Sequence, residues 1–370
     1  MPTERPLSLI VSKTSIRNLL RCYRGALSQP AAPLVVAGII VVCGGIAMRL
    51  VNVRMPNALT FDEHHFVENA RNYLGGQADW NDHPPLGKLL IAVGIALVGD
   101  NGLGWRIAPL IFGVGSIGMA FALGRTAFQS RLAGLMAAAF VAADGFLIAY
   151  SKSALLDGFL VFFQLLTVYL ALGTKGGTGV LLTGACWGLA MGIKFSGAVM
   201  ALPIAVILAT RIRPLSRAAV LTVGTGLVAV VVYLAQFSLG LALAGKPYGF
   251  ESSMAVTWDL YQHHARLTDW KNPLTSRWYS WFIPQKPIMM YREPDGPYWR
   301  VMSSLGNLLL WWSSAVAALT CVLIGVRRGV LQLATGERRS RVAVSGHLLA
   351  RSPGPLVAQR ARLVHLSLPW

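Results

Sequence analysis

The sequence predicts an all-α polytopic membrane protein with about eight spans and two large outer loops. Hydrophobic residues make up 54% of the 370 residues, and charged residues only 13%, whereas in a soluble domain the charged share is nearer a quarter. The mean hydropathy is +0.54, and the apolar residues are grouped in long runs. These observations exclude a disordered chain and argue against an ordinary soluble domain.

The net charge of +18 indicates a membrane partner and no nucleic acid. Nucleic-acid binding needs a basic face on a water-soluble fold, but here the basic residues lie between apolar runs. The four cysteines imply no disulfide framework, since they lie in apolar runs or in a segment expected to be cytoplasmic. Five basic residues precede the first apolar run, and this leader is too long for a typical secretory signal, so we expect an uncleaved signal anchor.

A spanning helix needs roughly 20 apolar residues, and this criterion selects eight segments. They lie at about 34–50, 105–123, 132–150, 155–172, 178–194, 197–210, 218–240 and 304–325.

A ninth apolar segment, Leu89–Val98, is too short for a span and is expected to be an interfacial helix. Short cytoplasmic loops are enriched in Lys and Arg. With Leu89–Val98 on the membrane surface, the inside receives 19 basic residues and only two acidic ones, and 13 of the 15 acidic residues lie outside or at outer helix ends. If it spanned, the basic cluster at 211–217 would lie outside, against the rule.

The chain therefore divides into a basic cytoplasmic leader, a transmembrane domain and a basic tail. The boundaries are 1–33, 34–325 and 326–370, with outer loop 1 at about 51–104 and outer loop 2 at about 241–303. The tail contains no run long enough to span, so a truncated or altered C-terminus is an alternative to a native tail.

Outer loop 1 carries the residues with the most chemical interest. Asp62 and Glu63 are adjacent carboxylates about ten residues after the first span. One interpretation makes Asp62 the N-cap of a following helix, with Glu63 in its first turn. The other makes a carboxylate at the membrane surface a general base, with its pKa tuned by partial burial.

The second half of the loop reads His-Pro-Pro-Leu-Gly-Lys at 83–88 and predicts a rigid turn before a short helix. His64, His65 and His83 raise the question of a metal. Adjacent histidines point in different directions on a helix, and no HxxxH or HxH spacing occurs, so no metal is expected.

These motifs resemble the protein O-mannosyltransferase family, membrane glycosyltransferases of the GT-C type. The resemblance covers roughly residues 34–325, although Leu308 stands where proline is expected and a sugar-binding insert of eukaryotic members is absent, which fits a bacterial member. The similar pieces occur in the expected order: Asp62-Glu63, the 83–88 turn, Gly104-Trp105-Arg106, Tyr150-Ser151-Lys152 with Leu155–Phe159, Gly192–Gly197, Ser276–Trp281 with Lys286-Pro287 and Tyr291, and Gly306-Asn307 with Trp311-Trp312.

The resemblance implies a GT-C-like helix bundle and an enzyme of the cell membrane with its active site on the extracytoplasmic side. It implies transfer of mannose from a polyprenyl-phosphate-mannose lipid to Ser or Thr hydroxyls of exported proteins, with inversion and without a cofactor. The partners expected are that donor lipid, the acceptor proteins and the membrane, and a dimer is compatible with the resemblance.

Within this chemistry Asp62 is expected to be the general base, because a hydroxyl is a poor nucleophile until its proton is accepted. Glu63 is expected to orient the acceptor or to tune Asp62. Arg106 is the first candidate for the donor phosphate, since its guanidinium can contact phosphate bidentately.

Further cations at outer helix ends are candidates for the same phosphate, although each could equally snorkel to headgroups. These are Lys88, Lys152 and Lys194. His83 is expected to order its loop or contact the sugar, and Asp157 is expected to pair with Lys152 or Arg106.

Two other functions remain open on the sequence. One is a related lipid-dependent transferase acting on a glycolipid, similar to aminoarabinose transferases of lipid A. The other is a non-catalytic membrane protein, either a transporter or an inactive truncated homologue, although no inverted repeat typical of transporters is visible.

Overall fold

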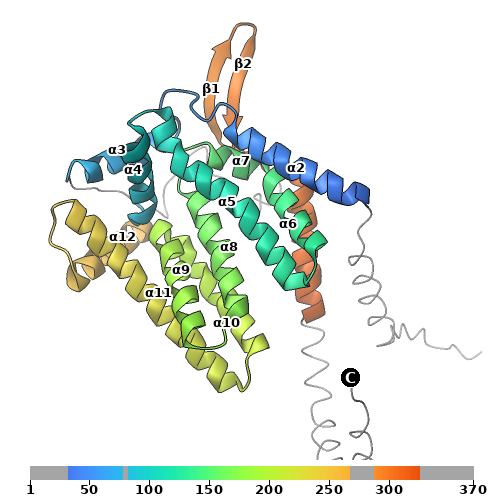
Figure 1. The fold of residues 1–370 in the computed structure, drawn as a ribbon. Coiled ribbons are helices and arrows are strands. Elements are labelled where there is room, and N and C mark those ends of the chain that lie inside the picture. The colour runs from blue at the N-terminus through green and yellow to red at the C-terminus, as the bar shows by residue number, and fades with distance from the viewer. Residues whose placement is uncertain (1–31, 78–81, 267–286, 326–370) are drawn as a thin grey trace, which may run out of the picture. The chain divides into compact units, whose positions relative to one another are not determined.

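The computed structural model describes residues 32–77, 82–266 and 287–325. It consists of two units, Met1–Leu310 and Trp311–Trp370. The predicted leader and tail fall almost wholly outside the described residues. The elements of the first unit are α2 Ala32–Leu50, α3 Glu63–Leu74, α4 Leu86–Val98, α5 Gly102–Phe128, α6 Arg131–Ala143, α7 Gly145–Ser151, α8 Asp157–Gly173, α9 Gly177–Ile193, η1 Phe195–Met200, α10 Ala201–Arg211, α11 Leu215–Leu243, α12 Phe250–Arg266, β1 Met289–Asp295 and β2 Tyr298–Ser303 (Figure 1).

Each predicted span contains helix, but several of these helices are shorter than the spans that the sequence predicted. Among the described residues α2, α5, α11 and the helix Leu308–Gly325 are long and apolar enough to cross a membrane, and α6 with α7 makes a fifth if the bent pair is one span. The predicted spans at 155–172, 178–194 and 197–210 are helices shorter than this. The chain is therefore a multi-pass membrane protein, with four or five candidate spans where the sequence predicted about eight.

The first unit is a bundle in which α5 packs along α6 and α8, and α9 packs along α8 and α11 (Figure 1). Its largest apolar cluster joins α3, α4, α8 and α9 through fully buried side chains, among them Val67, Ile91, Phe159 and Ile193. The short apolar helix predicted at Leu89–Val98 is α4, which packs between α3 and α5. This cluster supports the N-terminal end of α3, where the Asp-Glu pair lies.

Backbone contact between α4 and α5 depends on glycine. A Cβ built on Gly104 would overlap the carbonyl oxygen of Gly99, and one on Gly94 would lie 2.5 Å from the carbonyl oxygen of Gly104. We expect Gly104→Ala to lower the free energy of unfolding by about 1–3 kcal/mol, because the backbone must shift. Unfolding in detergent micelles measures this. Gly118→Ala in the same helix is the control: a Cβ there meets nothing within 4 Å, so no loss is expected, and equal losses in both variants would contradict the explanation.

The predicted span at 132–150 is broken. Helices α6 and α7 meet at an angle of 67°. Asp144 at the break accepts a hydrogen bond from the amide of Leu147 at 2.9 Å and so caps α7. On the other side of the break, the fully buried Arg49 of α2 donates to the carbonyl oxygens of Val141 and Ala142 at 2.9 and 3.0 Å. Charged side chains thus bind the free carbonyl groups at the end of α6 and a free amide at the start of α7.

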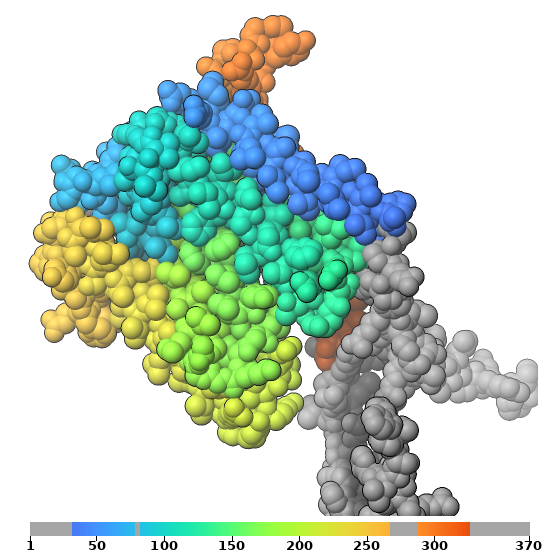
Figure 2. All heavy atoms as spheres, viewed as in Figure 1, coloured from blue at the N-terminus to red at the C-terminus, as the bar shows by residue number. Residues whose placement is uncertain are grey.

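The predicted helical class is confirmed, and the described residues add one element that the sequence did not predict. Strands β1 and β2 form an antiparallel hairpin within the predicted outer loop 2, and its turn is made by Gly296, at φ +60°, and Pro297. Met290 is buried in the largest apolar cluster, whereas Tyr298 near the turn is 75% exposed. The hairpin is anchored at its base and projects from the bundle (Figure 2).

Candidate active site

Glu63, the second carboxylate of the pair, is fully buried at the start of α3. Its Oε2 accepts hydrogen bonds from the amide and the hydroxyl of Thr60, both at 2.9 Å. Its Oε1 accepts a bond at 2.8 Å from the amide of Ala154, in the loop between α7 and α8. Glu63 therefore ties outer loop 1 to the following helices, and its oxygens are occupied.

Arg106 of α5 completes this arrangement. Its guanidinium donates from Nε to Oε1 of Glu63 at 2.7 Å and from Nη2 to Oε2 at 2.6 Å. It also donates to the carbonyl oxygens of Pro56 and Ala58. Arg106 was expected to face the donor phosphate, but it is 0% exposed and offers a ligand no open face. In the structure Arg106 neutralises Glu63 and fixes the loop, and its role toward the phosphate stays a prediction.

Asp62 differs from Glu63 in its burial and in its hydrogen bonding. It is half-buried, and its carboxylate makes no capping hydrogen bond, so the N-cap interpretation does not hold for its side chain. Burial raises the pKa of Asp62 above its ordinary value, although His65, His64 and Lys194 oppose the rise. The preceding residue, Phe61, has φ +49°, a left-handed conformation that is strained for a bulky residue. Asp62 is thus a half-buried carboxylate with a raised pKa that directly follows a strained residue.

Lys194 and Asp157 lie beside Asp62. The ammonium of Lys194, at the end of α9, lies 2.9 and 3.0 Å from the two carboxylate oxygens of Asp157, at the start of α8. Asp157 was expected to pair with Lys152 or Arg106, so its partner was predicted wrongly. The pair remains partly exposed, and both of its charges act on Asp62.

His83 lines the cavity between α3, α4, α11 and α12, and the charge of Lys194 acts on it as it does on Asp62. Its ring stacks on Phe66 at 5.9 Å and on His264 of α12 at 6.0 Å. Burial, together with the positive charges of Lys194 and Lys88, lowers the pKa of His83 to about 3. The imidazole is therefore neutral at physiological pH and suits hydrogen bonding or packing.

Helix α12 carries residues that the sequence reasoning missed. His263 lies 3.1 Å from the carboxylate of Asp82, and Nε2 of His264 lies 2.7 Å from the carbonyl oxygen of the same residue. These contacts close α12 over the His-Pro-Pro turn. The only local signal was a second adjacent pair of histidines at the end of an amphipathic segment.

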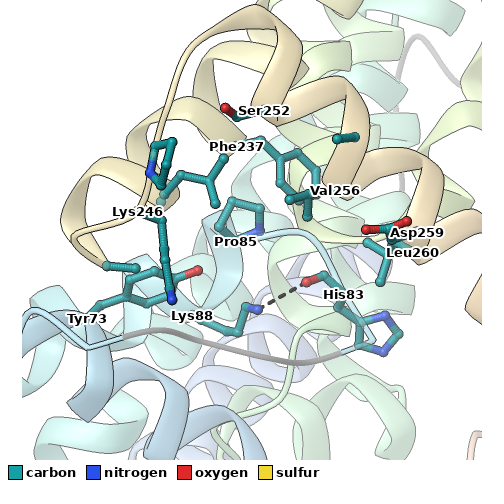
Figure 3. A pocket seen from close by; sticks show the side chains of 15 residues that line it. Tyr73, His83, Pro85, Lys88, Phe237, Lys246, Ser252, Val256, Asp259 and Leu260 are labelled. Carbon is teal, nitrogen blue, oxygen red and sulfur yellow. Dashed lines mark hydrogen bonds between the residues drawn. The ribbon is translucent and has the colours of Figure 1, made fainter.

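A cavity of about 530 Å³ opens between α3, α4, α11 and α12 (Figure 3). Lys88 is 2% exposed, and its ammonium donates to the carbonyl oxygen of His83 at 3.0 Å and lies 5.9 Å from the ring centroid of Tyr73. Lys246, which sequence reasoning missed, points to the same end of the cavity (Figure 3). The opposite walls are mainly apolar, with Phe237, Val256 and Leu260, and also carry the carboxylate of Asp259. The cavity therefore combines two cations at one end with a largely apolar wall that bears one acidic side chain.

Lys152 lies elsewhere. It lines a second cavity, below the β1–β2 hairpin, and it is not among the charges that act on Asp62. Burial and the nearby Arg106 lower the pKa of Lys152. The three candidate lysines are thus separated: Lys194 at Asp62, Lys88 at the α11–α12 cavity and Lys152 below the hairpin.

No three His, Cys, Asp or Glu side chains within the described ranges are placed to hold a metal ion. His64 and His65 are exposed, with ring centroids 4.4 Å apart. The absence of a metal stays a prediction.

The comparisons with known proteins agree with one another. Residues 39–246 match the family model described as dolichyl-phosphate-mannose-protein mannosyltransferase. The chain is similar to polyprenol-phosphate-mannose–protein mannosyltransferases of Mycobacterium tuberculosis, 36% identical over 110 residues (28% of this chain, 21% of the relative), and of Mycolicibacterium smegmatis, 38% identical over the same shares. The match thus spans about a fifth of the length of these relatives.

The fold is similar to a solved structure of the S. cerevisiae protein O-mannosyltransferase Pmt1–Pmt2 complex bound to the sugar donor. The TM-score is 0.50 at 19% identity, with 60% of this chain and 35% of that chain covered. The family model covers more than half of this chain. The chain belongs to the dolichyl-phosphate-mannose-protein mannosyltransferase family.

Proposed function

We propose that the chain transfers mannose from a polyprenyl-phosphate-mannose lipid to Ser or Thr hydroxyls of exported proteins, at the extracytoplasmic face of the cell membrane. One observation carries the proposal: a half-buried Asp62 carboxylate with a raised pKa, no capping bond and strained backbone before it, next to a Glu63 that is fully engaged. Family membership and the relatives' names support the sugar, donor and acceptor classes.

The reaction is a single displacement. The hydroxyl oxygen attacks the anomeric carbon, its proton passes to Asp62, and the bond to the lipid phosphate breaks, so that polyprenyl phosphate leaves and the configuration inverts. One carboxylate base suffices, and no covalent enzyme intermediate or cofactor is needed. Burial raises the pKa of Asp62, and the positive charge of Lys194 opposes this rise. Lys194 therefore helps to keep the Asp62 carboxylate ionised.

Positive charge is needed where the lipid phosphate departs, since stabilising that charge is usually the largest catalytic contribution. We place the phosphate at the Lys88 and Lys246 end of the α11–α12 cavity, with the first isoprene units against Phe237 and Leu260. His83 lines this cavity, and the charge of Lys194 acts on both His83 and Asp62.

The proposal is tested by mannose transfer in membranes that contain the chain. Polyprenyl-phosphate-mannose is supplied with a Ser/Thr peptide or with the same peptide carrying alanine at every hydroxyl position, and products are identified by mass spectrometry. One hexose added to the hydroxyl peptide alone is expected. Mannose transferred to a glycolipid and never to peptide would overturn the acceptor assignment.

The pH dependence of this reaction follows from Asp62. The base must be ionised, so kcat/KM is expected to fall as the pH drops through the pKa of Asp62, which burial places above the ordinary ~3.9 of an aspartate. A pH profile measures this midpoint. His83→Gln is the control, because His83 with a pKa of about 3 stays neutral over the assay range; a midpoint that moved in this variant would assign the titration to His83.

A further inference from the structure

The cavity below the hairpin is separate from the cavity between α3, α4, α11 and α12, and different residues line it. Its volume is about 700 Å³. It lies between the segment that follows α2, helix α7 and the β1–β2 hairpin. Apolar side chains such as Met48, Ile148 and Leu305 alternate on its walls with polar ones such as Asn52 and Lys152.

The hairpin presents a defined face to this cavity. Tyr291 pairs with Met302, and Glu293 pairs with Arg300; all four line the cavity. Since side chains alternate along a strand, these four lie on one face. Val301 and Ser303 of β2, which alternate with Arg300 and Met302, line the cavity as well. Within the described residues the sheet has these two strands alone, so the outer edge of each strand has no neighbouring strand and its outward amides and carbonyls can bind an extended chain.

The charges in the cavity leave one side chain without a partner. The hydroxyl of Tyr291 donates to Glu293, and Nε of Arg300 lies 2.8 Å from Asp295. Lys152 is half-buried, and among the described residues its ammonium has neither a hydrogen bond nor a carboxylate partner; the charge acting on it is that of Arg106, which repels it. An incoming anion would satisfy this ammonium.

The cavity is also linked to the base. Lys152 and Ala154 lie in the same short loop, and the amide of Ala154 holds Oε1 of Glu63, the residue after Asp62. A group bound at Lys152 therefore lies close to the loop that positions the base.

We propose that this cavity binds an extended segment of the acceptor polypeptide, with an acidic side chain of that segment paired with Lys152. The inference rests on the proposed function, because the bound polypeptide is an acceptor only if the chain transfers mannose to it. The strand edges favour a polypeptide over a lipid, because they offer main-chain hydrogen bonds that an acyl chain cannot use. The chain would thereby prefer hydroxyl acceptors that have Asp or Glu nearby.

Peptide binding tests the proposal without requiring transfer. The full chain carrying Asp62→Asn is placed in phosphatidylcholine nanodiscs, and fluorescence anisotropy compares a Ser/Thr peptide rich in Glu with its Gln counterpart. The acidic peptide is expected to bind about tenfold more tightly. Lys152→Gln should remove this preference, Lys152→Arg should retain it, and Lys152→Glu should favour a Lys-containing peptide. Lys175→Gln, an exposed lysine outside both cavities, should leave the preference unchanged.

Two results would overturn the proposal. One is an equal loss of affinity for the acidic peptide and for its Gln counterpart in the Lys152→Gln variant. The other is displacement of the acidic peptide by phosphatidylglycerol in the nanodisc, which would assign the cavity to an anionic lipid. A chain that selects acidic peptides through Lys152 yet transfers no mannose would refute the proposed function alone, and one that transfers mannose without this selection would refute the acceptor site alone.

Discussion

Asp62→Asn is expected to lower kcat for mannose transfer by about 10²–10⁴-fold, the usual contribution of a general base. Asparagine has nearly the same size as aspartate and cannot accept the hydroxyl proton. Because Glu63 and Arg106 fix the loop without help from the Asp62 side chain, KM for the donor should change little. Steady-state kinetics with donor and peptide varied separately measure both quantities.

Glu68→Gln provides the matched control. Glu68 is an exposed carboxylate on the same helix, α3, and its loss should leave kcat unchanged. If Asp62→Asn kept full activity, the base would be another group, and if both variants lost activity equally, the effect would be one of surface charge.

Arg106→Met is expected to lower the free energy of unfolding by about 3–5 kcal/mol, the cost of leaving one member of a buried ion pair without its partner. Glu63 would keep its hydrogen bonds to Thr60 and Ala154 but lose the charge that neutralises it. Removing both charges, as Glu63→Gln with Arg106→Met, should recover part of the loss, because no uncompensated charge then remains. Unfolding in detergent micelles measures all three proteins.

Arg71→Met is the control for this prediction. Arg71 binds Asp100 in the same two-bond geometry, but the two side chains are 41% and 46% exposed, so the expected loss is below about 1 kcal/mol. Equal losses in Arg71→Met and Arg106→Met would show that burial does not set the cost.

The positions of the helices could be predicted from the sequence because long apolar runs have few alternatives in a membrane. Lengths were harder to predict. The run at 132–150 reads as one span because Asp144 is the one charged residue within it. The capping bond of Asp144 and the contacts of Arg49 show why the helix breaks there. The hairpin had a local signal, Asp295-Gly296 between alternating residues, which the apolar-run criterion passes over.

The candidate site was predicted in part. The sequence selected Asp62, His83 and Lys194, and in the structure the charge of Lys194 acts on both Asp62 and His83. It could not show that Arg106 would bind Glu63 across 43 residues, since a charged residue beside a carboxylate pair suits a phosphate equally well. Nor could it place Lys246 at the same end of the cavity as Lys88, because that proximity depends on how α11 and α12 fold back over α4.

The buried Arg49 has a consequence for how the chain is assembled during synthesis. Arginine in the first apolar helix costs free energy in a bilayer until its donors are satisfied. Its acceptors at Val141 and Ala142 are more than 90 residues later in the chain, so α2 reaches its final seat only after the ribosome has made α6. Until then the guanidinium lacks these two acceptors, so Arg49 couples the stable packing of the first described helix to the synthesis of a helix that is made much later.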